Sequence, residues 1–96
     1  MDMETLMAQA QDLQSKISAA QDSLAQMHVK GIAGNGDVIV VMTGKYDIVS
    51  VTISPNVLIN GAEQISLLVM NAYKDAKNKA DALIEKVMSQ ITGPAE

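Results

Sequence analysis

The 96-residue chain contains no cysteine, and its single histidine is His28. The absence of cysteine excludes disulfides and thiolate metal sites, and one histidine cannot hold a metal ion without several carboxylates around it. A domain of this size buries only a modest part of its surface. Small proteins usually compensate with disulfides, a metal or a partner chain, so association with another chain is the route that remains.

Long hydrophobic runs are also absent. The longest uninterrupted apolar segments are residues 38–42 and 67–70, far short of the roughly 20 residues that span a bilayer. The chain begins Met-Asp-Met-Glu, which is acidic where a secretory signal peptide is basic. We therefore expect a soluble, intracellular protein that makes no contact with a membrane.

Positive charge is scarce. The chain has seven lysines, no arginine and eleven acidic residues, giving a net charge of −4. Affinity for duplex DNA comes mainly from cations that neutralise phosphates, and a basic patch is the usual footprint of a DNA-binding protein. Composition alone therefore favours a protein partner over a nucleic acid.

The first segment of the chain has the pattern of an amphipathic helix. Apolar residues recur in steps of three and four, at Met3, Leu6, Ala10, Leu13, Ile17, Ala20, Leu24 and Met27. This heptad-like stripe continues for more than three heptads and indicates one buried seam. Asp2 and Glu4 lie where the helix dipole favours negative charge. The pattern predicts a helix over about residues 3–27.

The middle of the chain, residues 28–54, changes to a strand pattern. Asn35 between two glycines is a strong hairpin signal, because Asn and Gly accept the positive φ of a tight turn. Residues 38–43 read VIVVMT, residues 44–47 supply a second turn, and residues 48–54 read IVSVTIS. In that last segment Val49, Val51 and Ile53 alternate with polar residues, which predicts a strand buried on one face.

The central strand of this predicted meander, residues 38–42, is apolar on both faces. A single layer of helices covers only one face of a sheet. A second subunit is the simplest cover for the other face.

The last segment again has helical periodicity. Pro55 cannot donate to a strand ladder and so ends the third strand. Asn60, with Glu63 three residues later, is the predicted helix cap, and Gly93-Pro94 is the predicted stop. The apolar positions between them are Ile65, Leu68, Val69, Ala72, Ala76, Ala80, Leu83, Val87 and Ile91. The sequence therefore predicts one α+β domain over residues 1–96: a helix, a three-stranded antiparallel sheet, and a helix over about residues 62–91.

No catalytic motif is found. The glycines of residues 31–36 have no GK[ST] ending and join strand to strand, so a hairpin explains them better than a phosphate loop. His28 has no serine and acid partner, and Asp81 and Glu85 fit a solvated helix face. We predict that the protein is not an enzyme and uses no cofactor, no metal and no small-molecule substrate.

The lysines of the second helix have two interpretations. Lys77 precedes Asp81 by four residues and Asp75 precedes Lys79 by four, so each pair can form a surface ion pair. In one interpretation these lysines only solvate the helix; in the other they contact a ligand. Lys79 and Lys86 lie together at one border of the apolar stripe, Lys74 and Lys77 lie on the outer face, and Lys16 is the only cation of the first helix.

The middle of the chain and its second helix resemble a known family. Residues 36–44 read GDVIVVMTG, and residues 48–55 read IVSVTISP, followed by Leu58. Residues 68–80 read LVMNAYKDAKNKA, and the Gln-rich first helix contains MAQAQ at residues 7–11. In this order and spacing the segments are similar to the YbaB/EbfC family of bacterial nucleoid-associated proteins. One departure is Lys74, which stands before Asp75 where the family usually has Asn.

The resemblance implies an α–β–β–β–α fold that dimerises through its sheets, with helices projecting like arms. It also implies a cytoplasmic protein of the nucleoid that binds double-stranded DNA with low sequence specificity. The absence of arginine excludes bidentate guanine readout, so backbone contact by lysine is the mode we expect. The candidate contacts are Lys79 and Lys86, followed by Lys74, Lys77 and Lys16.

An alternative function remains open at this point. The Met- and Ala-rich seam packs on the sheet in one interpretation, and in the other part of it forms an exposed groove. In that case the protein is a chaperone-like or adaptor homodimer that holds protein clients with its helical arms. A salt series separates the two functions, because phosphate binding weakens steeply with salt and apolar binding does not.

Overall fold

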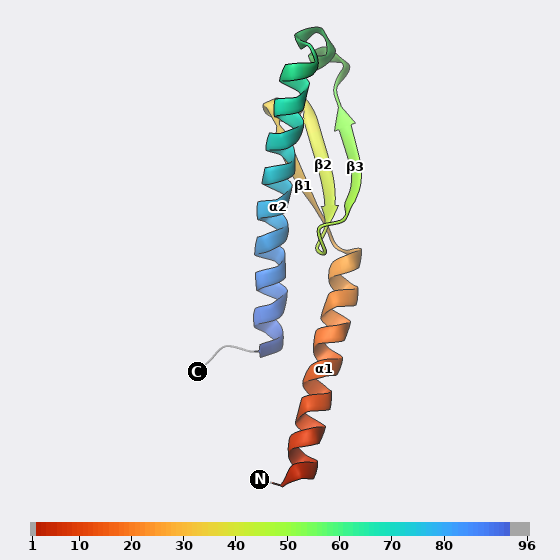
Figure 1. The fold of residues 1–96 in the computed structure, drawn as a ribbon, viewed down its shortest axis with the longest axis vertical. Coiled ribbons are helices and arrows are strands. Elements are labelled where there is room, and N and C mark those ends of the chain that lie inside the picture. Colours follow the sequence, from red (N-terminus) through yellow and green to blue (C-terminus); the bar gives the residue numbers. More distant parts are fainter. Residues whose placement is uncertain (1, 93–96) are drawn as a thin grey trace.

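The computed structural model describes residues 2–92 as two long helices joined by a three-stranded sheet (Figure 1). The elements, in chain order, are α1 (Met3–Gln26), β1 (His28–Ala33), η1 (Gly34–Gly36), β2 (Val38–Thr43), β3 (Ile48–Ile53), η2 (Pro55–Asn60) and α2 (Ala62–Thr92). The predicted helix–sheet–helix order and the α+β class are confirmed. The stop predicted at Gly93-Pro94 lies outside the described residues.

Helix α1 is fixed at both of its ends. The carboxylate of Asp2 accepts a hydrogen bond from the Thr5 N–H at 2.8 Å, which caps the helix and lowers the pKa of Asp2. At the other end, the Gly44 N–H donates to the carbonyl oxygens of Leu24 at 2.9 Å and Met27 at 3.1 Å. A Cβ at Gly44 would lie only 2.8 Å from the Leu24 carbonyl. The turn after β2 thus holds the end of α1 against the sheet.

The sheet is an antiparallel meander in the order β1-β2-β3. The β1–β2 hairpin turns through Gly34, Asn35 and Gly36, whose φ values of 63°, 57° and 99° are all positive. Because glycine and asparagine tolerate this backbone region, the hairpin predicted from these residues forms here.

Helix α2 packs across β1 and β2. The core between them consists of Val38, Val40 and Met42 from β2 and three alanines of α2, Ala72, Ala76 and Ala80. These alanines let the helix approach the sheet closely. At Gly31 the approach is closest, because a Cβ there would lie 1.9 Å from the Ala72 carbonyl oxygen and 2.4 Å from the Ala76 nitrogen.

Strand β3 differs from its prediction. All six of its residues are exposed, although the alternating pattern predicted one buried face. The physical reason is that α2 lies over β1 and β2 and the helix is too narrow to cover a third strand. In addition, the register shifts between Val41 and Met42, so that Met42 pairs with Ile48 and Val49 is an extra residue.

The far face of β2 is apolar, as its sequence indicates. Val38 and Val40 lie under α2, whereas Ile39 and Val41 point to the other face and are half-buried. The far-face residues of β2 are half-buried, whereas all six residues of β3 are exposed. Most of the uncovered apolar surface of the sheet therefore lies on β3.

The predicted cap of α2 is wrong. Asn60 is the last residue of η2, and α2 begins at Ala62 after Gly61. The Gly61 carbonyl accepts the N–H of Ile65 at 3.2 Å, so Gly61 and not Asn60 stands at the N-cap position. Pro55 is favoured at the start of a helical turn, and the turn that it begins includes Asn60.

Candidate nucleic-acid interface

Among residues 2–92, three of the seven lysines form ion pairs with acids on their own helix. Two of these pairs, those on α2, are the ones predicted from the four-residue spacing, and the structure confirms them. The nitrogen–oxygen distances are 3.1 Å for Lys79–Asp75, 3.5 Å for Lys77–Asp81 and 3.2 Å for Lys16–Asp12.

The Lys79–Asp75 pair also binds the edge of the sheet. Asp75 accepts a hydrogen bond from the Ile32 N–H at 2.9 Å, and Lys79 Nζ donates to the Lys30 carbonyl oxygen at 2.7 Å. The bond from Ile32, followed by that from Lys79, lowers the pKa of Asp75. We call these two side chains the edge clamp, since they satisfy two backbone groups of β1 that point away from β2.

The edge clamp places Lys79 at the β1 edge, where two further lysines lie on β1 itself and on the same border of α2. Lys79 touches β1 at Lys30, and Lys86 lies seven residues further along the same border of α2, about 10 Å away. Lys30 is opposite Val41 in the sheet, so its side chain points to the face away from α2. We call Lys30, Lys79 and Lys86 the β1-edge lysines. Asp75 is the acid that lies among them.

Sequence reasoning did not include Lys30 among the candidate contacts. The available signal was strand alternation, which places Lys30 on the opposite face from Val29 and Gly31. Its proximity to Lys79 was not predictable, because the two residues are 49 positions apart.

Lys77 lies on the opposite border of α2, in a separate cluster. The Tyr46 hydroxyl donates a hydrogen bond to Asp81, and Lys77 Nζ lies 5.6 Å from the centre of the Tyr46 ring. The hydrogen bond raises the pKa of Tyr46 and lowers that of Asp81. This cluster fastens the β2–β3 turn to α2 and leaves Lys77 engaged with an acid and a ring.

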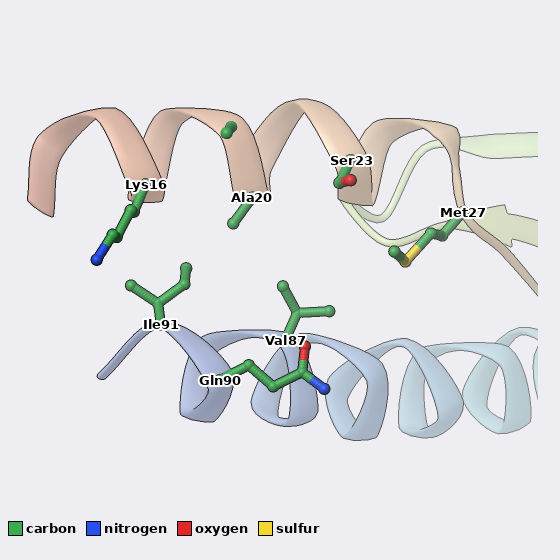
Figure 2. Close-up of a pocket in the computed structure, with 8 residues that line it drawn as sticks. Lys16, Ala20, Ser23, Met27, Val87, Gln90 and Ile91 are labelled. Carbon is green, nitrogen blue, oxygen red and sulfur yellow. The ribbon is translucent and has the colours of Figure 1, made fainter. Parts of the chain in front are cut away.

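The two remaining candidates are not part of the β1-edge cluster. Lys74 is exposed on α2 and has no ion-pair partner among residues 2–92. Lys16 extends from α1 toward Ile91 of α2 (Figure 2). It borders a groove of about 420 Å³ between the helices, whose lining is Lys16, Ala19, Ala20, Ser23, Met27, Val87, Gln90 and Ile91.

This groove has the composition of a helix–helix seam. Among residues 2–92, its lining contains no acid and no histidine. Nor does the described part of the chain contain a group of three His, Cys, Asp or Glu residues able to hold a metal ion. Between residues 2 and 92, neither helix has a stretch apolar enough for a membrane span.

Comparison with known proteins identifies the family. The model of the YbaB/EbfC DNA-binding family matches residues 1–95. The chain belongs to the YbaB/EbfC family. Its relatives include a nucleoid-associated protein of Bradyrhizobium diazoefficiens, 39% identical over 92% of this chain and 84% of the relative. Another is a nucleoid-associated protein of Gloeothece citriformis, 37% identical over 95% of this chain and 80% of the relative.

The YbaB/EbfC fold also appears in a solved structure. A protein of Helicobacter pylori, described as uncharacterized, superposes with a TM-score of 0.86 over 97% of this chain and 99% of its own, at 18% identity. At that identity the likeness concerns the fold alone. The residues that carry the YbaB/EbfC resemblance in α2 include Asp75, Ala76 and Lys79, and in this chain they fasten α2 to β1.

Proposed function

We propose that this YbaB/EbfC protein binds double-stranded DNA as a nucleoid-associated homodimer, and that the β1-edge lysines contact the phosphate backbone. The observation that supports this site is the gathering of Lys30, Lys79 and Lys86 along one edge. Lys79 keeps 46% of its side chain exposed while it forms the edge clamp. Its charge therefore remains available to a phosphate beside it.

The charge of the whole molecule sets the strength of this binding. A dimer carries −8, twice the −4 of one chain, so its long-range field repels DNA and does not speed association. Binding must then come from the local lysine clusters, and few phosphates are neutralised. We expect weak binding, and little sequence preference because no arginine is present to read guanine.

The other candidate lysines are weaker contacts in this proposal. Lys77 and Lys16 each have an acid within 3.5 Å, as Lys79 does, but both lie away from the β1 edge and its other lysines. Lys74 also lies away from that edge. We retain all three as secondary contacts that a curved or second duplex segment could reach.

The homodimer is proposed to form at the edge of β3. The Ser54 N–H donates to the Asp37 carbonyl at 2.7 Å, so Val38 and Ile53 are a non-hydrogen-bonded pair. The backbone groups of Val51 and Ile53 therefore point away from β2. An exposed strand edge of this kind favours pairing with another strand, whereas the edge clamp occupies the β1 edge.

Side chains support the same interface. Val51 is 45% exposed, and antiparallel pairing of two β3 strands about this residue would place it beside its own copy. A six-stranded sheet formed in this way leaves both sets of β1-edge lysines at its outer ends. Val51→Asp should therefore yield a folded chain that no longer pairs through β3, while Thr52→Asp on the polar face of the same strand should leave that pairing intact.

DNA binding is tested with two matched double variants. Lys30→Glu with Lys86→Glu reverses two β1-edge lysines without breaking the edge clamp. Lys45→Glu with Lys74→Glu makes the same change of net charge at two lysines that also lack an ion-pair partner among residues 2–92. We expect the first pair to weaken binding to unrelated duplexes several-fold more than the second. Equal losses would show that net charge, and not the β1 edge, determines affinity.

A second candidate function is the holding of apolar protein segments by the helical arms. It is favoured by the exposure of Met3, Leu6 and Leu13 on α1. An unfolded client should bind with little dependence on salt, and Leu6→Asp should weaken that binding. If duplex DNA does not bind at low salt and a client does, this function replaces the DNA-binding one.

A further inference from the structure

The first half of α1 projects beyond the described end of α2 (Figure 1). Every residue from 2 to 16 is exposed. Large apolar side chains on this segment are far more open than a folded core allows: Met3 is 71% exposed, Met7 57% and Leu6 47%. We call residues 2–16 the α1 arm.

The α1 arm has the pattern of a helix that packs on another helix. Met3, Leu6, Ala10 and Leu13 are spaced three and four residues apart, as the a and d positions of a heptad are. An isolated helix of this length is only marginally stable in water. The three acids on the arm, against one lysine, disfavour an anionic membrane surface as the partner.

We propose that the α1 arm pairs antiparallel with the α1 arm of a second copy of this chain. In this register Met3 lies opposite Leu13 of the second copy, and Leu6 lies opposite its Ala10. The small Ala10 lets the two helices approach closely at the centre. Met7 lies beside its own copy at the flank, so each large apolar residue of the arm gains an apolar neighbour.

Charge selects the antiparallel direction. Asp2, Gln9 and Lys16 share one heptad position that flanks the apolar stripe. In the proposed register Asp2 of each copy lies beside Lys16 of the other, and Gln9 lies beside Gln9. A parallel pair would instead place Asp2 beside Met7 of the second copy and Lys16 beside its Gln21, so neither charge would gain an opposite charge. Lys16 already pairs with Asp12 of its own helix, but the two side chains are 59% and 66% exposed. Such an exposed ion pair contributes little stability, so Lys16 can leave Asp12 for Asp2 of the second copy.

This interface is separate from the proposed pairing at β3. The molecule is 68 Å long, and the α1 arm and the sheet lie at different positions along that axis (Figure 1). The two-fold axis between antiparallel arms crosses α1 near Gln9, so it does not pass through the sheet. Paired arms would therefore link one sheet dimer to another. If the sheet dimers bind DNA, the paired arms would bridge two DNA segments, and this role rests on the proposed function. The pairing of the arms does not depend on DNA binding.

Disulfide trapping tests the register, because the chain has no native cysteine. Gln9→Cys should cross-link to itself under mild oxidation, while Ala8→Cys, on the opposite face of the helix, should not. A mixture of Asp2→Cys and Lys16→Cys chains should form the mixed disulfide in preference to the two symmetrical ones. Preference for the symmetrical products, or equal trapping of Ala8→Cys, would overturn the antiparallel pairing.

Light scattering coupled to gel filtration tests the association itself. At high protein concentration Leu6→Asp should halve the apparent mass relative to the unmodified protein. Leu67→Asp, at a leucine of α2 with similar exposure (50%), should not change it. A mass that Leu6→Asp leaves unchanged overturns the proposal. If Leu6→Asp yields a 10.2 kDa monomer, the arm pairing stands and the β3 dimer fails, so the two failures are distinguishable.

Discussion

Replacement of Gly31 by alanine should separate α2 from the sheet. The new Cβ would lie 1.9 Å from the Ala72 carbonyl oxygen, 2.4 Å from the Ala76 nitrogen and 2.7 Å from the Ala76 Cβ. Favourable non-bonded contacts are about 3.5 Å or longer, so α2 must retreat by about 1.5 Å. The opposing atoms belong to a helix backbone and cannot rotate away. A retreat of this size also lengthens both hydrogen bonds of the edge clamp.

The cost follows from this geometry. Overpacking a core usually costs about 1–3 kcal/mol, and the rigid backbone here places Gly31→Ala at about 3 kcal/mol or more. For a domain of this size that corresponds to a fall in Tm of at least about 12 °C. Thermal unfolding should be followed by circular dichroism at one fixed protein concentration, because association makes Tm depend on concentration.

Gly36→Ala is the matched control for Gly31→Ala. No atom lies within 4 Å of a Cβ at Gly36, and only its φ of +99° is unfavourable, which costs about 1–2 kcal/mol. If Gly31→Ala unfolds at the same temperature as Gly36→Ala or higher, the close approach of α2 to β1 does not stabilise this fold, and the reasoning is refuted.

Three further predictions concern the sheet and its fastenings. Folding lowers the pKa of Asp75, so its carboxylate stabilises the fold at pH values above its ordinary pKa, and this stabilisation is lost as the pH falls through the lowered pKa. Asp75→Asn should therefore lower the free energy of unfolding at neutral pH and make it depend less on pH. Urea unfolding at pH values from about 7 to 3 measures both effects. Tyr46→Phe removes the hydroxyl that holds Asp81, so an NMR titration should find the pKa of Asp81 higher in the variant, and an unchanged value would contradict that contact. Val40→Asp buries a carboxylate at a position 1% exposed and should abolish folding at a cost of several kcal/mol, whereas a folded Val40→Asp chain in circular dichroism would contradict the assignment of the core.

The elements of this fold were predictable from local patterns. The stripe from Met3 to Met27 and the turn at Asn35 each specify structure within a few residues, and the structure contains the helix and the hairpin. The burial of β3 was not predictable in the same way. Its alternation describes a strand that fits a one-sided surface, but whether a helix reaches that surface depends on where Gly31 and Ala76 place α2.

The candidate site was predictable only in part. The spacing of Asp75 and Lys79 predicted their ion pair, because both lie on one helix. Their hydrogen bonds to β1 join residues 43 and 49 positions apart, and no local pattern contains that information. For the same reason Lys30 was missed. The cap assigned to Asn60 failed because Pro55 begins a separate helical turn that extends to Asn60.

The central claim, phosphate binding by the β1-edge lysines, is tested most directly by titrating a fluorescent duplex at two salt concentrations. If one duplex contacts three lysines of one edge, the slope of log K against log salt should be about −2.7, a loss of roughly 40-fold between about 50 and 200 mM salt. Two duplexes of unrelated sequence should give the same slope. A duplex that does not bind at about 50 mM salt, or binds with an affinity that salt does not change, would contradict the account.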